Sequence, residues 1–116
     1  MNKAGTDYEN YPIAEGNLLG ERVYRLAKRG GEEKVVVRLS HPRQSQYGPH
    51  FICQVEIEDN ERRYMTMGGF DAIEAILSAL TYVGVVLRFI ETCEGASLEP
   101  VSDIPIEDLA HFPSTD

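Results

Sequence analysis

A long apolar helix limits the folds that are open to this chain of 116 residues. After Gly68-Gly69 the hydrophobic period changes from two to about 3.6, and the helical pattern runs over 71–93. Asp71 occupies the N-cap position and Glu74 follows three residues later, so this pair predicts a capping box in which Asp replaces Ser or Thr. Glu94-Gly95 predicts the end of the helix.

Apolar residues occupy most of the circumference of this helix: Ile73, Ile76, Leu77, Leu80, Val83, Val86, Leu87 and Ile90. Polar residues keep to one narrow stripe: Glu74, Ser78, Thr81, Arg88 and Thr92. Such a helix is expected to be buried on more than one side, as a core helix. A homodimer helix remains an alternative. The uncharged run over 75–87 is shorter than the ~20 residues that cross a bilayer, so we expect no membrane partner.

Four segments before the helix have the character of strands: Glu21–Lys28, Lys34–Ser40, Phe51–Glu58 and Glu61–Met67. Turn residues at Gly30-Gly31 and Asp59-Asn60 join consecutive segments, which favours an antiparallel meander. The predicted fold is therefore α+β, with a four-stranded antiparallel meander sheet packed against one long helix. A possible short C-terminal helix spans 105–112, where proline and two acids stand in the first turn.

The chain divides into a loosely ordered leader (1–20), an α+β core domain (21–93) and an acidic tail (94–116). The net charge is -8, and residues 71–116 carry nine acids against Arg88 alone. This balance argues against nucleic acid as a partner, because phosphate binding needs a basic surface. Two cysteines and an N-terminus without a signal-peptide pattern predict a cytoplasmic protein with reduced thiols.

Several segments together resemble a known family. These are Arg22-Val23, Val35-Val36-Val37-Arg38, Pro42-Arg43, Phe51-Ile52-Cys53-Gln54-Val55 and the helix start over 69–76. This pattern resembles a family of small uncharacterised bacterial domains, in which a strand meander leads to a Gly-x-Asp-Ala/Ser-x-Glu/Gln-Ala-Ile/Leu helix. The resemblance covers about residues 21–90, and Phe70 stands where a smaller residue is common. It implies a bacterial origin and no known activity.

One polar loop, 41–50, gathers titratable and aromatic groups: His41, Arg43, Tyr47 and His50. These residues could supply an acid–base pair and an anion clamp, as a small hydrolase or ribonuclease requires. The alternative is a solvated hairpin loop. No third catalytic group is placed by spacing, so we expect no enzyme.

Metal and cofactor sites are not expected either. His41 and His50 are nine residues apart, and Cys93 follows Cys53 by forty, so no pair has the spacing of a metal site. Cys53 is better explained as a small core residue.

The acidic tail interleaves carboxylates with large apolar residues, and the candidate partner-binding residues are Glu94, Glu99, Asp103, Glu107, Asp108 and Phe112. Apolar anchors ringed by acids suit a cationic protein surface. Folding back onto the sheet would use the same apolar residues. The leading hypothesis is a small cytoplasmic interaction protein, most concretely an immunity protein that occludes a cationic toxin domain. A homodimeric ligand-binding module is a further alternative.

Overall fold

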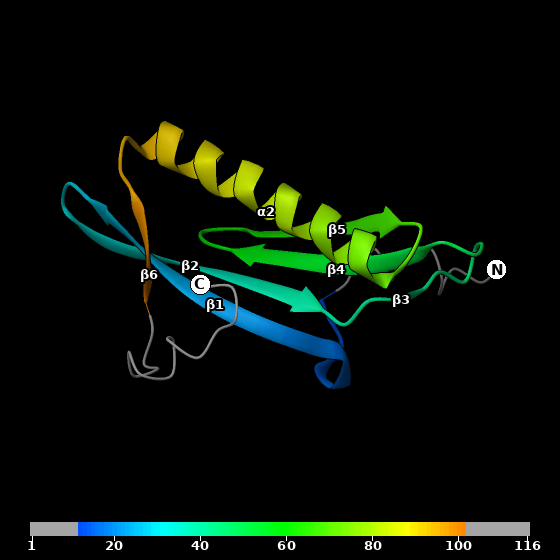
Figure 1. Ribbon diagram of the computed structural model, residues 1–116. Coiled ribbons are helices and arrows are strands. Elements are labelled where there is room, and N and C mark those ends of the chain that lie inside the picture. The colour runs from blue at the N-terminus through cyan, green and yellow to red at the C-terminus, as the bar shows by residue number, and fades with distance from the viewer. Residues whose placement is uncertain (1–11, 102–116) are drawn as a thin grey trace, which may run out of the picture.

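The computed structural model describes residues 12–101, which form one antiparallel sheet with a single long helix across one of its faces (Figure 1). This confirms the predicted α+β class. The elements are η2 (Glu15–Asn17), β1 (Leu18–Lys28), β2 (Gly31–Ser40), β3 (Arg43–Gln44), β4 (Phe51–Glu58), β5 (Arg62–Gly69), α2 (Ala72–Glu94) and β6 (Leu98–Val101).

The four main strands form the predicted meander, because β1 pairs with β2, β2 with β4 and β4 with β5, all antiparallel. The described sheet nevertheless has six strands, so the predicted number of four is wrong. β5 pairs along the whole of β4, so β2 and β3 share the opposite edge of that strand. β6 adds to the outer side of β1 and pairs with it from Val23 to Leu26.

The two additional strands are short and have little local signal. β3 has two residues. β6 has four, contains Pro100, and lies within the segment predicted as an acidic tail. Its partner β1 is more than seventy residues earlier in the chain, so no local pattern indicates the pairing. The Glu91 carboxylate of α2 accepts a hydrogen bond from the Leu98 N–H at 2.8 Å, which ties the start of β6 to the helix. The possible helix over 105–112 lies outside the described residues.

Three strands are longer than their patterns predict. β1 begins at Leu18 rather than Glu21, because it continues to pair with the end of β2 across a register shift between Leu18 and Gly20. β2 begins at Gly31 rather than Lys34, because the first hairpin continues in register up to its turn. Gly30 and Gly31 supply that turn with φ values of 90° and 148°. Gly68-Gly69 does not end β5, since both glycines still pair with β4.

The ends of α2 follow the prediction closely. The Asp71 carboxylate accepts a hydrogen bond from the Glu74 N–H at 2.8 Å, and the Glu74 carboxylate in turn accepts from the Phe70 N–H. At the other end, Gly95 adopts a left-handed conformation (φ 66°) and its N–H donates to Glu91 O at 2.8 Å. These contacts satisfy backbone groups that a helix leaves unpaired at its termini.

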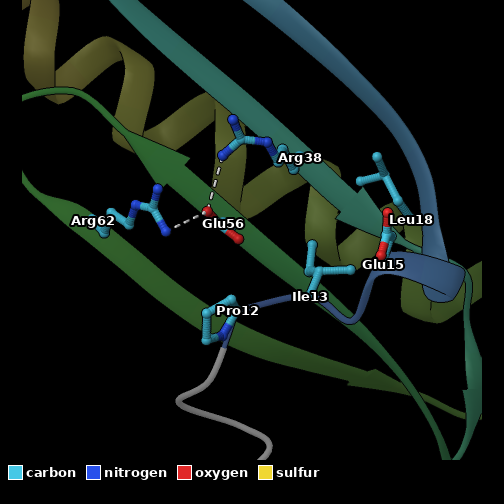
Figure 2. Close-up of a pocket in the computed structure, with 7 residues that line it drawn as sticks. All are labelled: Pro12, Ile13, Glu15, Leu18, Arg38, Glu56 and Arg62. Carbon is cyan, nitrogen blue, oxygen red and sulfur yellow. Dashed lines mark hydrogen bonds and ion pairs between the residues drawn. The ribbon is translucent and has the colours of Figure 1, made fainter.

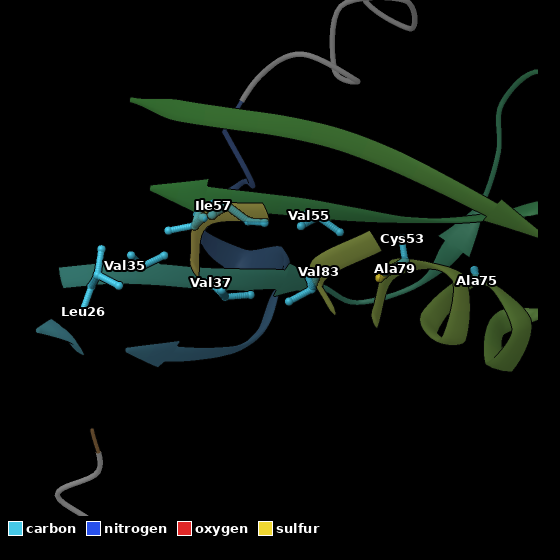
Figure 3. Packing of buried hydrophobic residues seen from close by; sticks show 10 residues of the cluster. Leu26, Val35, Val37, Cys53, Val55, Ile57, Ala75, Ala79 and Val83 are labelled. Atoms are coloured by element: carbon cyan, nitrogen blue, oxygen red, sulfur yellow. The ribbon is translucent and has the colours of Figure 1, made fainter. Parts of the chain in front are cut away.

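The core lies between α2 and the sheet (Figure 3). The helix contributes small residues at its closest contacts, Ala75 and Ala79, which are fully buried, followed by Val83 and Ile90. The sheet contributes Leu26, Val35, Val37, Cys53, Val55 and Ile57. Cys53 is fully buried in this cluster, which confirms its prediction as a core residue.

The prediction that α2 is a core helix buried on more than one side is wrong for the single chain. Ile73, Leu77 and Leu80 are 69%, 57% and 47% exposed. The sheet covers one side of the helix, and no other element within 12–101 lies on its opposite side (Figure 1). Hydrophobic periodicity reports how apolar each side of a helix is, but the neighbours that cover a side depend on the tertiary structure.

The end of β5 passes so close to the start of α2 that only glycine fits at position 69. A Cβ on Gly69 would lie 2.5 Å from Ala75 N and 2.7 Å from Glu74 C, which are backbone atoms that cannot rotate away. We expect Gly69→Ala to lower the free energy of unfolding by about 2–3 kcal/mol, measured by urea denaturation. Gly68→Ala is the matched control, because its Cβ would meet Phe51 O at an ordinary 3.6 Å. Equal effects of the two substitutions would contradict this close approach.

Candidate functional site

The face of the sheet that points away from α2, here called the far face, carries a cluster of charges. Arg38 of β2 lies at its centre and donates to Glu21 at 2.7 Å, to Glu56 at 2.9 Å and to Glu58 at 3.0 Å. These residues share a face because Arg38 pairs directly with Glu21 of β1 on one side and with Glu56 of β4 on the other. Arg62 of β5 adds ion pairs to Glu56 at 3.8 Å and to Glu58 at 3.4 Å.

These contacts favour the charged forms of Arg38 and Glu58, as the directions of their pKa shifts show. Burial opposes the charge of Arg38, but hydrogen bonds to Glu58 and Glu21 outweigh it and raise the pKa of this guanidinium. The hydrogen bond from Arg38 lowers the pKa of Glu58. The cluster is therefore a set of internally satisfied ion pairs around Glu56, whose side chain is 4% exposed.

A shallow cavity of about 320 Å³ lies above this cluster (Figure 2). Its floor is formed by Arg38, Glu56 and Arg62, and its wall by Pro12, Ile13, Glu15 and Leu18 from the segment that leads into β1. The two arginines already bind carboxylates of the same chain, and the lining carries two acids for its two bases. An anionic ligand would have to displace these internal partners, so the cavity is a poor candidate site.

The loop predicted as an acid–base site has its histidines at separate places. Ser45 N–H donates to His50 O at 2.8 Å, which makes 45–50 a tight loop beyond the two-residue strand β3. His41 follows β2 and its N–H donates to Asn17 O at 2.8 Å. The pairing of β2 and β3 with β4 places His41 three or four residues away from His50 along the direction of β4. This offset is a backbone separation of roughly 10 Å. The register therefore does not set the two residues opposite each other.

Each of the four loop residues is exposed, and Tyr47 is 57% exposed. The Tyr47 N–H donates to Ser45 Oγ at 2.9 Å, while Arg43 pairs through its backbone with Ile52. None of the cavity-lining residues comes from this loop. Among residues 12–101, no group of three or more His, Cys, Asp or Glu side chains is arranged to hold a metal ion.

Two of the six predicted partner-binding residues fall in the described part of the chain. Glu94 forms an ion pair with Lys28 at 3.4 Å, and Glu99 forms one with Arg25 at 3.5 Å. Both acids are thus partly neutralised by bases of β1. Asp103, Glu107, Asp108 and Phe112 lie outside the described residues.

The most distinctive surface is the solvent side of α2. Between positions 73 and 89 its exposed residues are Ile73, Glu74, Leu77, Leu80, Thr81, Val85, Arg88 and Phe89, which we call the outer face. Five are large apolar residues, with exposed fractions between 47% and 69%. The predicted polar stripe supplies Glu74, Thr81 and Arg88, which run along the middle of this face because they are spaced by seven residues, nearly two helical turns. Exposed apolar surface on both flanks of this stripe makes the outer face the candidate interaction surface of the described residues.

By length and composition, α2 is also long and apolar enough to cross a membrane, and less than a third of its most apolar part is buried in the fold. Core helices share these properties. Here Ala75, Ala79 and Val83 pack against the sheet, so α2 would have to leave β4 and β5 before lipid could surround it.

The sequence contains a signal for the outer face. Ile73, Leu77 and Leu80 are apolar, which predicts the core, yet they flank the polar stripe on a helical wheel. A stripe that contains Glu74 and Arg88 points away from the apolar core of its own domain, and its immediate neighbours point the same way.

Comparison with known families identifies the chain. It belongs to the family described as "Domain of unknown function (DUF6968)", whose model matches residues 20–103. This confirms the resemblance to a family of uncharacterised domains, and the match includes β6 as well as α2. No curated protein and no solved structure matches the chain.

The far-face cluster predicts a test of how Glu56 is held. Arg38→Met leaves this buried carboxylate with Arg62 at 3.8 Å as its remaining ion pair among the described residues. We expect the free energy of unfolding to fall by about 2 kcal/mol, because the desolvated charge loses its closest partner. The double variant Arg38→Met/Glu56→Leu should regain at least half of this loss in urea denaturation. A double variant less stable than Arg38→Met would contradict this account.

Acid should weaken the fold through the β4–β5 turn. The hydrogen bond from Arg38 lowers the pKa of Glu58; for Asp59, burial acts in the opposite direction, but hydrogen bonds from Glu61 N–H and Arg63 lower the pKa overall. Carboxyls with a depressed folded-state pKa stabilise the fold above their unfolded pKa of about 4, and this stabilisation is lost as the pH falls through the folded value. Urea denaturation between pH 7 and pH 2.5 should show that decline below about pH 4. A Glu58→Gln/Asp59→Asn variant should show a shallower decline than the unaltered chain, and an equal slope would contradict the assignment.

Proposed function

We propose that this domain is a non-catalytic, cytoplasmic protein-interaction domain that binds its partner through the outer face of α2. The observation that carries this proposal is the exposure of five large apolar side chains on a helix that is firmly packed on its other side. A free domain gains nothing from exposing them, because each would be more stable buried. A partner that covers this face supplies the missing burial.

The mixed character of the outer face supports a protein as the occupant. Glu74 and Arg88 lie along its middle with opposite charges, while apolar residues flank them. Protein interfaces combine an apolar contact with a few polar groups that fix orientation. The cytoplasmic placement is supported by two free thiols, Cys53 in the core and Cys93 on the surface, since reducing compartments keep such thiols unpaired.

A second candidate function is the more specific one of an immunity protein that occludes a cationic toxin domain. The charge of residues 71–116, nine acids against Arg88, favours it, because an acidic surface steers a basic partner. The ion pairs of Glu94 with Lys28 and of Glu99 with Arg25 reduce the contribution of these two acids. Binding of this kind would weaken steeply as the salt concentration rises.

Site-specific photo-crosslinking tests where the partner binds. A photoreactive phenylalanine analogue placed at Leu77 or Val85, in the full chain within cells of the source organism, should yield adducts after irradiation. The matched control carries the analogue at Lys34, an exposed position on β2 that lies away from α2. Adducts at the two helix positions and none at the control support the proposal. Absence of adducts at Leu77 and Val85, with expression equal to the control, would overturn it.

A further inference from the structure

We propose that the partner of the outer face is a second copy of this chain, bound so that two α2 helices lie antiparallel about a two-fold axis at Thr81. The inference rests on the proposed function in one respect, namely that the outer face is the binding surface. It goes further by naming the occupant, the register and the residue pairs of the interface.

Apart from Leu80, the residues of the outer face are arranged symmetrically about Thr81. In an antiparallel pair centred on that residue, positions equally far before and after it lie at the same height. Ile73 of one copy then lies level with Phe89 of the other, because each is eight residues from the centre. Leu77 lies level with Val85 in the same way, because each is four residues from the centre. Each of these four levels therefore carries an apolar residue from both helices, one on either flank of the polar stripe. A two-fold interface needs this self-complementary pattern, because each helix presents the same surface.

The charges follow the same symmetry with opposite signs. Glu74 stands seven residues before Thr81 and Arg88 seven residues after it, so each dimer would contain two Glu74–Arg88 pairs. Arg88 forms no ion pair with the residues from 12 to 101, although it is the one Lys or Arg after Arg63 in the whole sequence. A parallel arrangement in register would instead set Arg88 against Arg88. The charge pattern thus selects the antiparallel orientation.

Gly84 gives an independent indication of close approach from outside. Glycine weakens a helix interior relative to alanine, so its presence needs a reason. A Cβ at this position would meet only the flexible end of Arg88, at 4.0 Å, within the described chain. Intramolecular packing therefore does not require glycine here. In the proposed dimer, Gly84 lies level with Ser78, three residues on the other side of Thr81, and two such small residues let the helix axes approach closely.

The centre of the contact is also suitable for burial. The Thr81 hydroxyl already donates to Leu77 O at 2.9 Å, so its polar group keeps a partner when water is excluded. The five exposed apolar side chains amount to roughly 500 Å² on each copy, taking ~150–200 Å² for a large side chain. With the polar stripe added, this lies near the lower limit of specific interfaces, which bury about 800 Å² a partner. We therefore expect weak association whose extent depends on the protein concentration.

Sedimentation velocity of the purified full chain between 1 and 500 µM tests the inference. We expect the sedimentation coefficient to rise from that of a monomer to that of a dimer across this range. Arg88→Glu should raise the dissociation constant at least tenfold, because each pair would become Glu opposite Glu. Lys34→Glu is the matched control with the same change of charge on β2, and it should leave dimerisation unchanged.

A mixing experiment tests the register itself. Glu74→Lys alone and Arg88→Glu alone should each be monomeric, because like charges face one another in both homodimers. An equimolar mixture should dimerise, since the introduced lysine of one copy then faces the introduced glutamate of the other, and the native Arg88 faces the native Glu74. Because Glu74 also accepts from the Phe70 N–H, circular dichroism and the thermal midpoint must first show that Glu74→Lys is folded. Gly84→Gln provides a second route, as it should weaken the dimer tenfold or more without lowering the thermal midpoint of the monomer.

The outcomes separate the two proposals. A chain that stays monomeric to 500 µM overturns the second-copy inference, while crosslinked adducts of another mass at Leu77 would still support the proposed function. A dimer that survives both Arg88→Glu and Gly84→Gln uses a different surface and also overturns the inference. A mixture of the two charge variants that remains monomeric overturns the register.

Discussion

The close contact between α2 and the β4–β5 hairpin governs the rest of the structure. It depends on small residues on both sides: Ala75 and Ala79 on the helix, and Gly69 where the hairpin meets the helix start. Ala75 and Ala79 let the first half of the helix lie close to the sheet, and larger residues such as Val83 and Ile90 pack against the sheet farther along. Five other large apolar side chains remain on the side that the sheet does not cover. The flat seating of α2 and the exposure of its outer face are therefore two consequences of one sequence pattern.

The two faces of the sheet are stabilised by different interactions. The helix side buries apolar residues, whereas the far face pairs buried and half-buried charges around Arg38 and Glu56. The latter network uses its own carboxylates to occupy both arginines, so it contributes orientation and register rather than a binding site. Among the surfaces of the described residues, the outer face of α2 is therefore the one with a large apolar area that no other element covers. The helix is therefore a better candidate binding surface than the cavity on the far face.

Local signals predicted the parts of the fold that depend on neighbouring residues. The capping box at Asp71, the end at Gly95 and the four main strands depend on short-range chemistry, and all of them are confirmed. β6 depends on pairing with β1, which only the folded chain brings near, and the burial of α2 depends on which elements reach it. The partner-binding acids were predicted from composition, but composition does not show that Lys28 and Arg25 already lie beside Glu94 and Glu99.

The polarity of the outer face distinguishes between the environments that such a helix could enter. Lipid would place Glu74, Thr81 and Arg88 in the middle of a surface without water or partners, and burial of a lone charge there is costly. A larger apolar core would impose the same cost. In an interface between copies, each charge meets its opposite at the same height while the flanking apolar residues lose their water. Burial of the polar stripe thus requires a surface that offers complementary charges at these heights, and this helix turned end to end is such a surface.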